Sequence, residues 1–370
     1  MASFPRGAFA DPGFMPAAAA TAQPRSGHRL AVPVCVLWCL VLAGCDVEPI
    51  AHEDTPRAPH HQRARVELAL GAFSAAREVF DSQLLPAFAR QQQQHGREIT
   101  FTKVYAGSEA LTGTIASGFN ADVAVFAHTG DMESLIGAGL VGETWRDAPN
   151  RGIFCRSVVV MAVRKGNPKS VRDWADLTRP GLAIVTPDPA SSGGGIWNLC
   201  ALYGAALRGH VGVPANDVVA ARDFLARVEA NVVDRRASAT ESFRAFLAGA
   251  GDVAITYESE VALAWLFGHE VERVIPSSTI LVESPAALLD KNVAAHGVRA
   301  EAQAFFEYLW TSDAQKKLAY CGFRPVDDAV AAASGGQFPQ PKDLWTIEHL
   351  GGWDRAVRAI RAPLPARPPK

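Results

Sequence analysis

The stretch PDPASSGGGIWN at residues 187–198 is the most informative part of this chain. It lies between an apolar run at residues 182–186 and a segment with helical spacing at residues 197–207. A strand, a loop of serine and glycine, and a helix in this order direct several backbone N–H groups at one point, where small residues let a ligand approach and the helix N-terminus adds partial positive charge. The loop contains no lysine, so it is not the phosphate loop of nucleotide hydrolases. The pattern predicts a cradle for a small anion held by neutral donors, or else a ligand-free connection.

Short strands alternate with helical segments on both sides of this loop. Strands are predicted at residues 66–70, 98–104 and 122–126, and helices at residues 74–88, 301–310, 312–319 and from the end of a loop at residues 105–109 to about residue 118. Such alternation is typical of an α/β protein with a parallel sheet, in which ligands bind at the carboxyl ends of the strands. The loop at residues 105–109 occupies that position, as the Ser/Gly loop does. Because about 300 residues exceed one ordinary core, we expect two lobes.

The first 44 residues have the pattern of a secretory signal. Two arginines precede an apolar run at residues 30–42, which is shorter than the roughly 20 residues a membrane span needs and ends in LAGC at Cys45. This ending resembles the bacterial lipobox, in which the cysteine is lipidated; a membrane anchor helix is the alternative. Residues 45–65 are polar and contain three prolines, which predicts a tether. We therefore expect a protein on the periplasmic side of a bacterial membrane, lipid-anchored through Cys45.

Composition argues against several classes of function. Without residues 1–44 the chain has 33 basic and 37 acidic side chains, a net charge of −4 with histidine neutral, and no basic face for nucleic acid. Three cysteines remain after Cys45, namely Cys155, Cys200 and Cys321. They lack C-x-x-C spacing, which predicts buried free thiols rather than a zinc site or disulfides. No H-E-x-x-H motif occurs, and we expect neither a metal nor a cofactor.

Further segments, taken in chain order, resemble one family. They are VRKGNPK at 163–169, DWADL at 173–177, IVTPDP at 184–189 leading into SSGG at 191–194, GDVAITYESE at 251–260, VIP at 274–276, IL at 280–281, DKNV at 290–293 and GGW at 351–353. Over about residues 66–360 this series is similar to the sulfate-binding proteins of bacterial ABC importers. The resemblance implies an α/β, two-lobed periplasmic-binding-protein fold of type II, with parallel-type sheets in each lobe, two crossing strands and a ligand cleft between the lobes.

The expected division of the chain follows from this resemblance and from the long apolar runs. Lobe 1 comprises residues 66–152 and 257–330, lobe 2 comprises residues 153–256, and residues 331–370 pack back on the lobes. The apolar segments at residues 153–163 and 252–257 are the candidate crossing strands.

The resemblance also implies the ligand and the residues that hold it. Family members bind a tetrahedral sulfate or thiosulfate through uncharged donors and deliver it to an ABC permease. Carried over by position, the ligand-binding residues are Ser74, Ser108, Ser192, Gly193, Gly194 and Tyr257. Tyr257 stands where the family has a tryptophan donor, and Ser74 where it has an aspartate. The expected protein is a monomer whose partners are the oxyanion, the permease and, through Cys45, the membrane, with no nucleic acid.

Several positions depart from the family pattern. Glu109 follows Ser108 in place of glycine, Ile196 replaces an arginine after the cradle, and Arg235 and Arg236 either add charge to the ligand or only solvate a loop. Sulfate offers only acceptors, whereas phosphate retains a proton and pairs with a carboxylate, so an inward Glu109 would favour phosphate. We expect Glu109 to point to solvent from the first helical turn, where the helix dipole favours an acid.

Other functions remain open on the sequence alone. Binding of another oxyanion such as phosphate or molybdate and a non-transport anion sensor are alternatives. A secreted hydrolase with Ser108 or Ser192 as nucleophile is a third, although neither serine lies in a G-x-S-x-G motif. We expect no catalysis.

Overall fold

The computed structural model describes residues 64–361 of the chain. The expected signal peptide (residues 1–44), the lipidation candidate Cys45 and most of the expected tether lie outside the described residues. Within residues 64–361, no helix is both long and apolar enough to cross a membrane.

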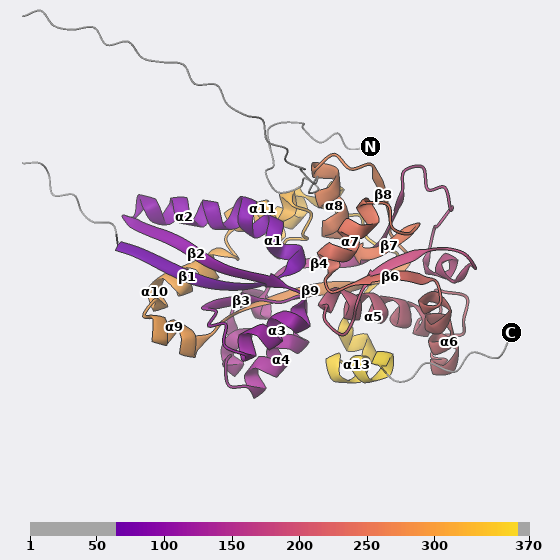
Figure 1. The fold of residues 1–370 in the computed structure, drawn as a ribbon, viewed down its shortest axis with the longest axis horizontal. Coiled ribbons are helices and arrows are strands. Elements are labelled where there is room, and N and C mark those ends of the chain that lie inside the picture. The colour runs from indigo at the N-terminus through magenta and orange to yellow at the C-terminus, as the bar shows by residue number, and fades with distance from the viewer. Residues whose placement is uncertain (1–63, 362–370) are drawn as a thin grey trace, which may run out of the picture. The chain divides into compact units, whose positions relative to one another are not determined.

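The first half of the described chain is a parallel sheet covered on both faces (Figure 1). Its strands are β1 (Ala64–Phe73), β2 (Arg97–Ala106) and β3 (Val123–Val125). Toward its carboxyl end β1 is buried on both faces, because the consecutive residues 70–73 are all buried, as expected for a strand in a sheet with both faces covered. The predicted strand at residues 98–104 is confirmed as β2. The predicted tether ends too late, because Ala64 and Arg65 already pair with β2.

The helices of this half follow the strands that position them. They are η1 (Ser74–Ala76), α1 (Arg77–Val79), η2 (Phe80–Leu84), α2 (Leu85–Gln94), α3 (Ser108–Ala116) and α4 (Gly130–Gly137). The first four run without a break and confirm the helix predicted from residue 74. Phe88 of α2 packs against Phe305 with ring centroids 5.1 Å apart. In Figure 1, α2 lies on one face of the sheet, and α3 and α4 lie on the other.

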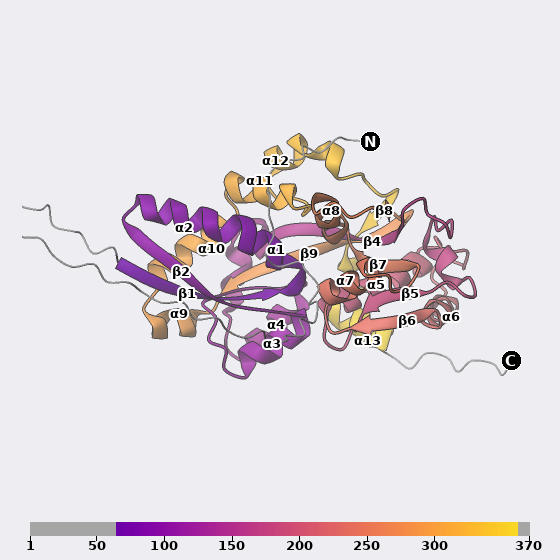
Figure 2. The same ribbon diagram turned by 45° about the horizontal axis from the view of Figure 1, so that its top comes forward.

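The second half of the described chain contains four shorter strands. They are β5 (Ile184–Pro187), β6 (Val232–Arg236), β7 (Val253–Tyr257) and β8 (Val271–Val274). Its helices are η5 (Trp174–Thr178), α5 (Gly193–Leu207), α6 (Val218–Glu229), α7 (Ala239–Leu247) and α8 (Glu258–Leu266). β5 pairs in parallel with β6 and β7, and α5 and α7 cover opposite faces of these strands (Figures 1 and 2).

Two long antiparallel strands connect the halves. β4 (Ile153–Arg164) follows η3 (Glu143–Asp147) and η4 (Pro149–Gly152), and its partner is β9 (Ser278–Leu288). β9 pairs with β3 of the first half, and β4 pairs with β7 of the second, so the described strands follow the order β2-β1-β3-β9-β4-β7-β5-β6. β8 pairs with β4.

The prediction that residues 252–257 form the second crossing strand is therefore wrong, because this segment is β7. β7 has only five residues and pairs with β4 and β5, whereas β9 has eleven and reaches both halves. After β7 the chain stays in the second half, because α8 contacts β4 and β8. An apolar run shows that a segment is buried, but its length and its pairing partners decide whether it crosses.

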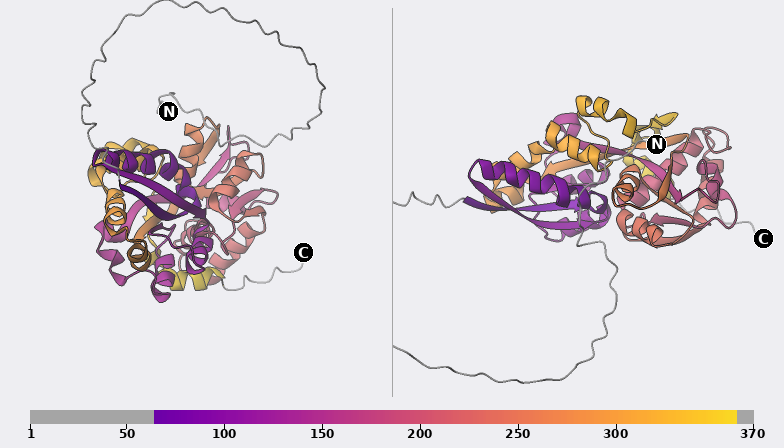
Figure 3. Two further views of the ribbon diagram at one scale, coloured as in Figure 1. Left: turned by 60° about the vertical axis from the view of Figure 1, so that its left-hand side comes forward. Right: turned by 90° about the horizontal axis from the view of Figure 1, so that it is seen from above.

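The last described segments follow β9. They are α9 (Asp290–His296), α10 (Arg299–Tyr308), α11 (Ser312–Tyr320), α12 (Asp328–Ala333), η6 (Gly335–Gln337), β10 (Asp343–Trp345), η7 (Ile347–Leu350) and α13 (Trp353–Arg361). β10 pairs in parallel with the start of β9, while η7 and α13 contact α5. Figure 3 shows from two further sides how the helices cover the strands.

Candidate functional site

Three of the predicted site residues stand at the carboxyl ends of parallel strands or in the loops that follow them. Ser108 begins α3 after β2, Ser192 precedes α5 after β5, and Tyr257 is the last residue of β7. The carboxyl ends of parallel strands are where α/β proteins bind ligands. α5 begins at Gly193, earlier than the predicted residue 197, so Gly193 and Gly194 lie in its first turn. There the backbone N–H groups have no partner inside the helix.

Close backbone contacts bring these loops together. A Cβ added to Gly107 would lie 2.1 Å from the carbonyl oxygen of Ser191, and one added to Gly193 would lie 3.0 Å from Cβ of Ser108. A Cβ on Gly194 would lie 3.3 Å from the hydroxyls of both Ser192 and Tyr257. Loops of the two halves thus meet at one point, and glycine is required because the backbones nearly touch.

The predicted residues at this point are almost fully buried. Ser108 is 1 %, Ser192 2 % and Tyr257 3 % exposed. The hydroxyl of Tyr257 has no hydrogen-bond partner within residues 64–361. Burial, together with the negative charges of Glu109, Glu260 and Asp131, raises the pKa of Tyr257 well above its usual value. The phenol therefore stays neutral and can donate one hydrogen bond to a ligand.

The Ser108 side chain is engaged with a buried carboxylate. Its hydroxyl donates to Oδ2 of Asp131 at 2.5 Å and accepts the backbone N–H of Ala127 at 2.9 Å. The hydroxyl of Thr112 donates to the other oxygen of Asp131 at 3.1 Å. The one hydroxyl hydrogen of Ser108 is thus committed to Asp131, and the donors that α3 can offer a ligand are backbone N–H groups of its first turn.

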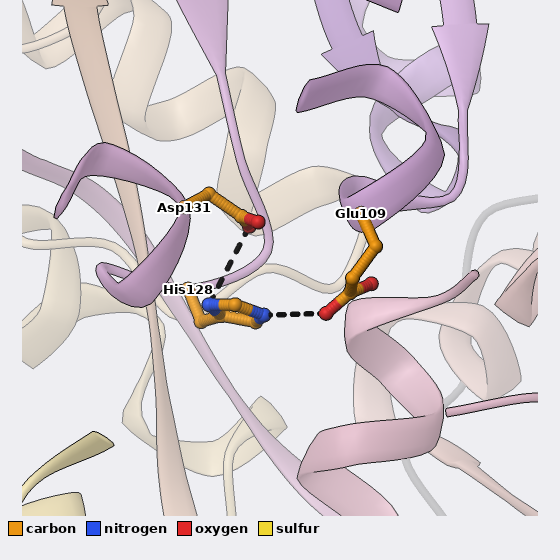
Figure 4. A group of neighbouring side chains, drawn as sticks. All are labelled: Glu109, His128 and Asp131. Carbon is orange, nitrogen blue, oxygen red and sulfur yellow. Dashed lines mark hydrogen bonds and ion pairs between the residues drawn. The ribbon is translucent and has the colours of Figure 1, made fainter. Parts of the chain in front are cut away.

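Glu109 does not point to solvent, and this prediction is wrong. Its Oε1 lies 2.9 Å from Nε2 of His128, and its Oε2 is buried without a hydrogen-bond partner in the described part of the chain. Figure 4 shows the imidazole of His128 lying between the carboxylates of Glu109 and Asp131. The reason is tertiary, because His128 belongs to the loop before α4. An ionised carboxylate repels an anion placed 4 Å away by about 4 kcal/mol per unit of charge at an effective dielectric constant of about 20.

His128 links this cluster to the C-terminal segment. Its ring stacks on Trp353 with centroids 4.3 Å apart, and Trp353 donates its indole N–H to the hydroxyl of Thr129. Trp197 of α5 donates its indole N–H to the carbonyl of Ala127 at 2.8 Å. The loop after β3 is therefore fixed by side chains from α5 and α13.

Within the cluster of Glu109, His128 and Asp131, neighbouring charges shift the pKa values of His128 and Asp131. Burial alone would lower the pKa of His128, but the charge of Asp131 and the hydrogen bond and charge of Glu109 outweigh it, so the pKa is raised. Burial raises the pKa of Asp131, and the nearby charge of Glu109 adds to this effect. Side-chain oxygens and nitrogens of the three residues lie within 4.8 Å of one another. Although these residue types also bind metal ions, their positions are already accounted for by the hydrogen bond of Glu109 to His128, the ion pair of His128 with Asp131, and the hydrogen bonds from Ser108 and Thr112.

Sequence reasoning missed His128 and Asp131. Both follow the strand predicted at residues 122–126, so the rule that picked out the loop of Ser108 would also have selected them. Another acid, Glu260 of α8, is buried, and its charge also acts on Tyr257. It accepts hydrogen bonds from the hydroxyls of Thr240 and Thr256, and burial raises its pKa to about 7.

Three further candidates stand on other elements. Ser74 begins η1, which contacts α7, and its side chain makes no hydrogen bond within residues 64–361. Arg235 pairs with Glu229, and Arg236 pairs with Asp234 at 2.8 Å, so both cations are balanced by neighbouring acids.

Ile196 and the cysteines are buried. Ile196 is a core residue of α5, 2 % exposed. The prediction of buried free thiols is confirmed for Cys155, Cys200 and Cys321, and burial raises the pKa of each.

With the fold and the geometry in place, comparison with known proteins defines the class. Residues 70–324 match the model of the family described as bacterial extracellular solute-binding proteins. The chain belongs to this family.

Three relatives show how far the likeness extends. The chain is 34 % identical to the sulfate-binding protein of Synechococcus elongatus over 291 residues, covering 78 % of this chain and 81 % of that protein. It is 32 % identical to the thiosulfate-binding protein of Pseudomonas aeruginosa, covering 74 % and 82 %. Among solved structures, the sulfate-binding protein SubI from Mycobacterium tuberculosis superposes with a TM-score of 0.72 at 37 % identity, covering 79 % of this chain and 98 % of that one. This likeness confirms the predicted two-lobed periplasmic-binding-protein fold.

Proposed function

We propose that this protein captures sulfate or thiosulfate outside the cytoplasm and delivers it to an ABC permease. The observation that carries the proposal is the convergence of neutral donors at one buried point: the first turn of α5 at Gly193 and Gly194, next to the unpartnered hydroxyl of Tyr257. A doubly charged anion suits such a site because helix N-termini favour negative charge and the donors need no counter-ion. The sulfate- and thiosulfate-binding relatives support the same ligand class.

The proposed ligand contacts come from both halves. Ser192 supplies its hydroxyl, Gly193 and Gly194 their N–H groups, and Tyr257 its phenol. Ser108 contributes through the N–H groups at the start of α3, because its hydroxyl is bound to Asp131. Ser74 contributes in the same way from the start of η1. Closure of the two halves on β4 and β9 would exclude water and strengthen each contact.

The remaining parts of the proposal concern the whole protein. The chain acts as a monomer without catalytic activity, and it is held on the periplasmic side of a membrane by a lipid on Cys45 after removal of a signal peptide at residues 1–44. Residues 45–63 serve as the tether. Lobe 1 comprises the first half and the segments from β9 to α12, lobe 2 comprises the residues between β4 and β9, and β10, η7 and α13 pack back on lobe 2. These statements rest on the sequence pattern, the family and the strand pairing.

Calorimetric titration of the purified protein with sulfate, thiosulfate, phosphate and molybdate tests the proposal. We expect sulfate or thiosulfate to bind, and Ser192→Ala to weaken binding about tenfold, since a hydrogen bond to a charged group contributes roughly 1.5–3 kcal/mol. Thermal stability should hardly change, because the Ser192 side chain does not cap α5.

The exposed Ser117, at the other end of α3, supplies the matched control, and Ser117→Ala should bind like the wild type. Equal affinities of wild type and Ser192→Ala would remove Ser192 from the site. Silence of the wild type toward both sulfate and thiosulfate would refute the function.

A further inference from the structure

One group in the site does not fit a set of neutral donors. The Glu109 carboxylate comes from the first turn of α3, next to Ser108, and only 18 % of its side chain is exposed. Its Oε1 is bound by His128, while its Oε2 is buried and has no hydrogen-bond partner in residues 64–361. The charge of Glu109 acts on the Tyr257 hydroxyl, which faces the first turn of α5. An unused acceptor therefore stands among the groups proposed to hold the anion.

An ionised carboxylate and a sulfate dianion have only acceptor atoms, so nothing can bond between them. A single hydrogen between the two oxygens removes the conflict and forms a short, charge-assisted hydrogen bond. That hydrogen has two sources. A monohydrogen oxyanion such as hydrogen phosphate carries it into the site, whereas sulfate must obtain it from solvent.

Resting on the proposed function, we propose that Glu109 determines the oxyanion specificity of this site by requiring one hydrogen between its Oε2 and the bound anion. Hydrogen-bearing oxyanions bring this hydrogen themselves. Fully ionised sulfate binds together with one proton, which bonds to the Glu109 carboxylate and is shared with the sulfate oxygen. In both cases one hydrogen lies between the Glu109 Oε2 and an oxygen of the bound anion.

The charged groups around Glu109 explain why sulfate binding requires a proton. On its own side stand His128, from the loop before α4, and Asp131 of α4. Tyr257 of β7 feels the charges of both Glu109 and Glu260 of α8, and Arg244 of α7 acts on Glu260. Arg361 of α13 acts on His128 from further away.

These charges do not cancel. An imidazolium at His128 balances one of the two carboxylates that flank it, and the raised pKa of His128 favours that form. With both carboxylates ionised, the cluster of Glu109, His128 and Asp131 carries one net negative charge. A dianion entering next to it adds to the negative charge, and uptake of one proton reduces the repulsion.

The decisive experiment is calorimetric titration with sulfate and with inorganic phosphate at about pH 6, 7 and 8. Each titration is run in two buffers of different ionisation enthalpy, which counts the protons taken up. For the wild type we expect about one proton per sulfate and a sulfate affinity that falls about tenfold per pH unit. At about pH 8, phosphate should bind without proton uptake.

The variant Glu109→Gln replaces the acceptor by an amide that donates its own hydrogen. We expect its sulfate affinity to be independent of pH, to exceed that of the wild type at least tenfold at about pH 8, and to involve no proton uptake. Its phosphate affinity should fall. The control Glu133→Gln removes a carboxylate of α4 that is paired with Arg146 at the surface, and it should titrate like the wild type.

The outcomes separate this inference from the proposed function. Sulfate binding by the wild type without proton uptake overturns the role of Glu109 and leaves sulfate capture intact. Proton uptake that persists in Glu109→Gln assigns the proton to a neighbour such as His128 and also overturns the inference. Absence of binding of both sulfate and thiosulfate in both proteins refutes the proposed function itself. If Glu109→Gln does not fold, the proton count of the wild type decides alone.

Discussion

Glu260 is a buried acid whose charge costs stability. Its carboxylate accepts two threonine hydroxyls, yet burial raises its pKa from the usual 4.5 to about 7. The folded state therefore holds the proton more tightly than the unfolded state. The resulting stability is fully present below about pH 4.5 and is lost as the pH rises through about 7, with a total of about 3 kcal/mol.

We expect Glu260→Gln to abolish this loss, since the amide oxygen still accepts a threonine hydroxyl but carries no charge. Denaturant unfolding at two pH values measures it. The variant should match the wild type near pH 4.5 and exceed its free energy of unfolding by up to about 3 kcal/mol at about pH 8. The exposed acid Glu241 of α7 provides the control, and Glu241→Gln should show no such gain. A stability difference that does not change with pH would contradict the prediction.

At the same scale, the sequence predicted where site residues stand but not where one of them points. Local strand ends and helix starts selected the loops of Ser108, Ser192 and Gly194, while the family resemblance selected the individual residues and Tyr257. The direction of Glu109 depends on His128, nineteen residues further along the chain, which the fold places beside it.

Among the elements, β10 is attached to α5 by one bidentate pair. Arg208, directly after α5, donates from Nε and Nη2 to the two oxygens of Asp343 at 2.6 and 2.5 Å. Asp343 also accepts the hydroxyl of Ser278 from β9 at 2.7 Å. The hydrogen bond from Arg208 is the main reason why the pKa of Asp343 is lowered to about 2.

A lowered pKa in the folded state gives stability that is present above the ordinary value near pH 4 and lost as the pH falls through about 2. We expect Asp343→Asn to reduce the free energy of unfolding by about 2 kcal/mol at about pH 6, and the difference from the wild type to shrink toward about pH 2. Denaturant melts across this range provide the measurement.

Asp290 serves as the matched surface pair, because its bond to Arg299 is largely exposed. Asp290→Asn should cost under about 1 kcal/mol. If Asp343→Asn and Asp290→Asn reduced the free energy of unfolding equally, the bidentate pair would contribute no more than a surface ion pair.

Element boundaries also show where local reasoning ends. Apolar runs located β4, β5 and β7, and the start at residue 74 located the first helix. The earlier start of α5 and the crossing role of β9 could not be predicted, because the first depends on Ser192 turning the chain and the second on which strands pair.

For the whole molecule, the approach of the two halves is limited by Gly107. A Cβ at this position would lie 2.1 Å from the carbonyl of Ser191 and 2.8 Å from that of Ala237, and neither backbone atom can move without moving its loop. The backbone conformation of Gly107 itself, with φ −58° and ψ 148°, is one that alanine adopts freely. A methyl group here therefore obstructs only the contact between the halves.

We expect Gly107→Ala to weaken sulfate binding at least tenfold while the thermal midpoint stays near that of the wild type. Titration combined with thermal unfolding distinguishes the two effects. Gly113, in the helix α3 that follows Gly107, has open space around it. Gly113→Ala should therefore leave the sulfate affinity unchanged and slightly stabilise the helix. Normal affinity in Gly107→Ala would show that the close approach is not needed for binding.

The sequence by itself determined the α/β class, the family, the candidate anion-binding loops and their order along the chain. The class and the loops follow from hydrophobic periodicity and from turn and helix-start residues, which act over a few neighbours, whereas the family follows from the resemblance of a series of segments. Only the tertiary structure decided that β9 joins the halves, that Asp131 takes the hydroxyl of Ser108, and that Glu109 turns inward to His128. Those features depend on contacts between residues far apart in the chain, where the partner of a side chain is set by the packing of whole elements and not by its neighbours in sequence.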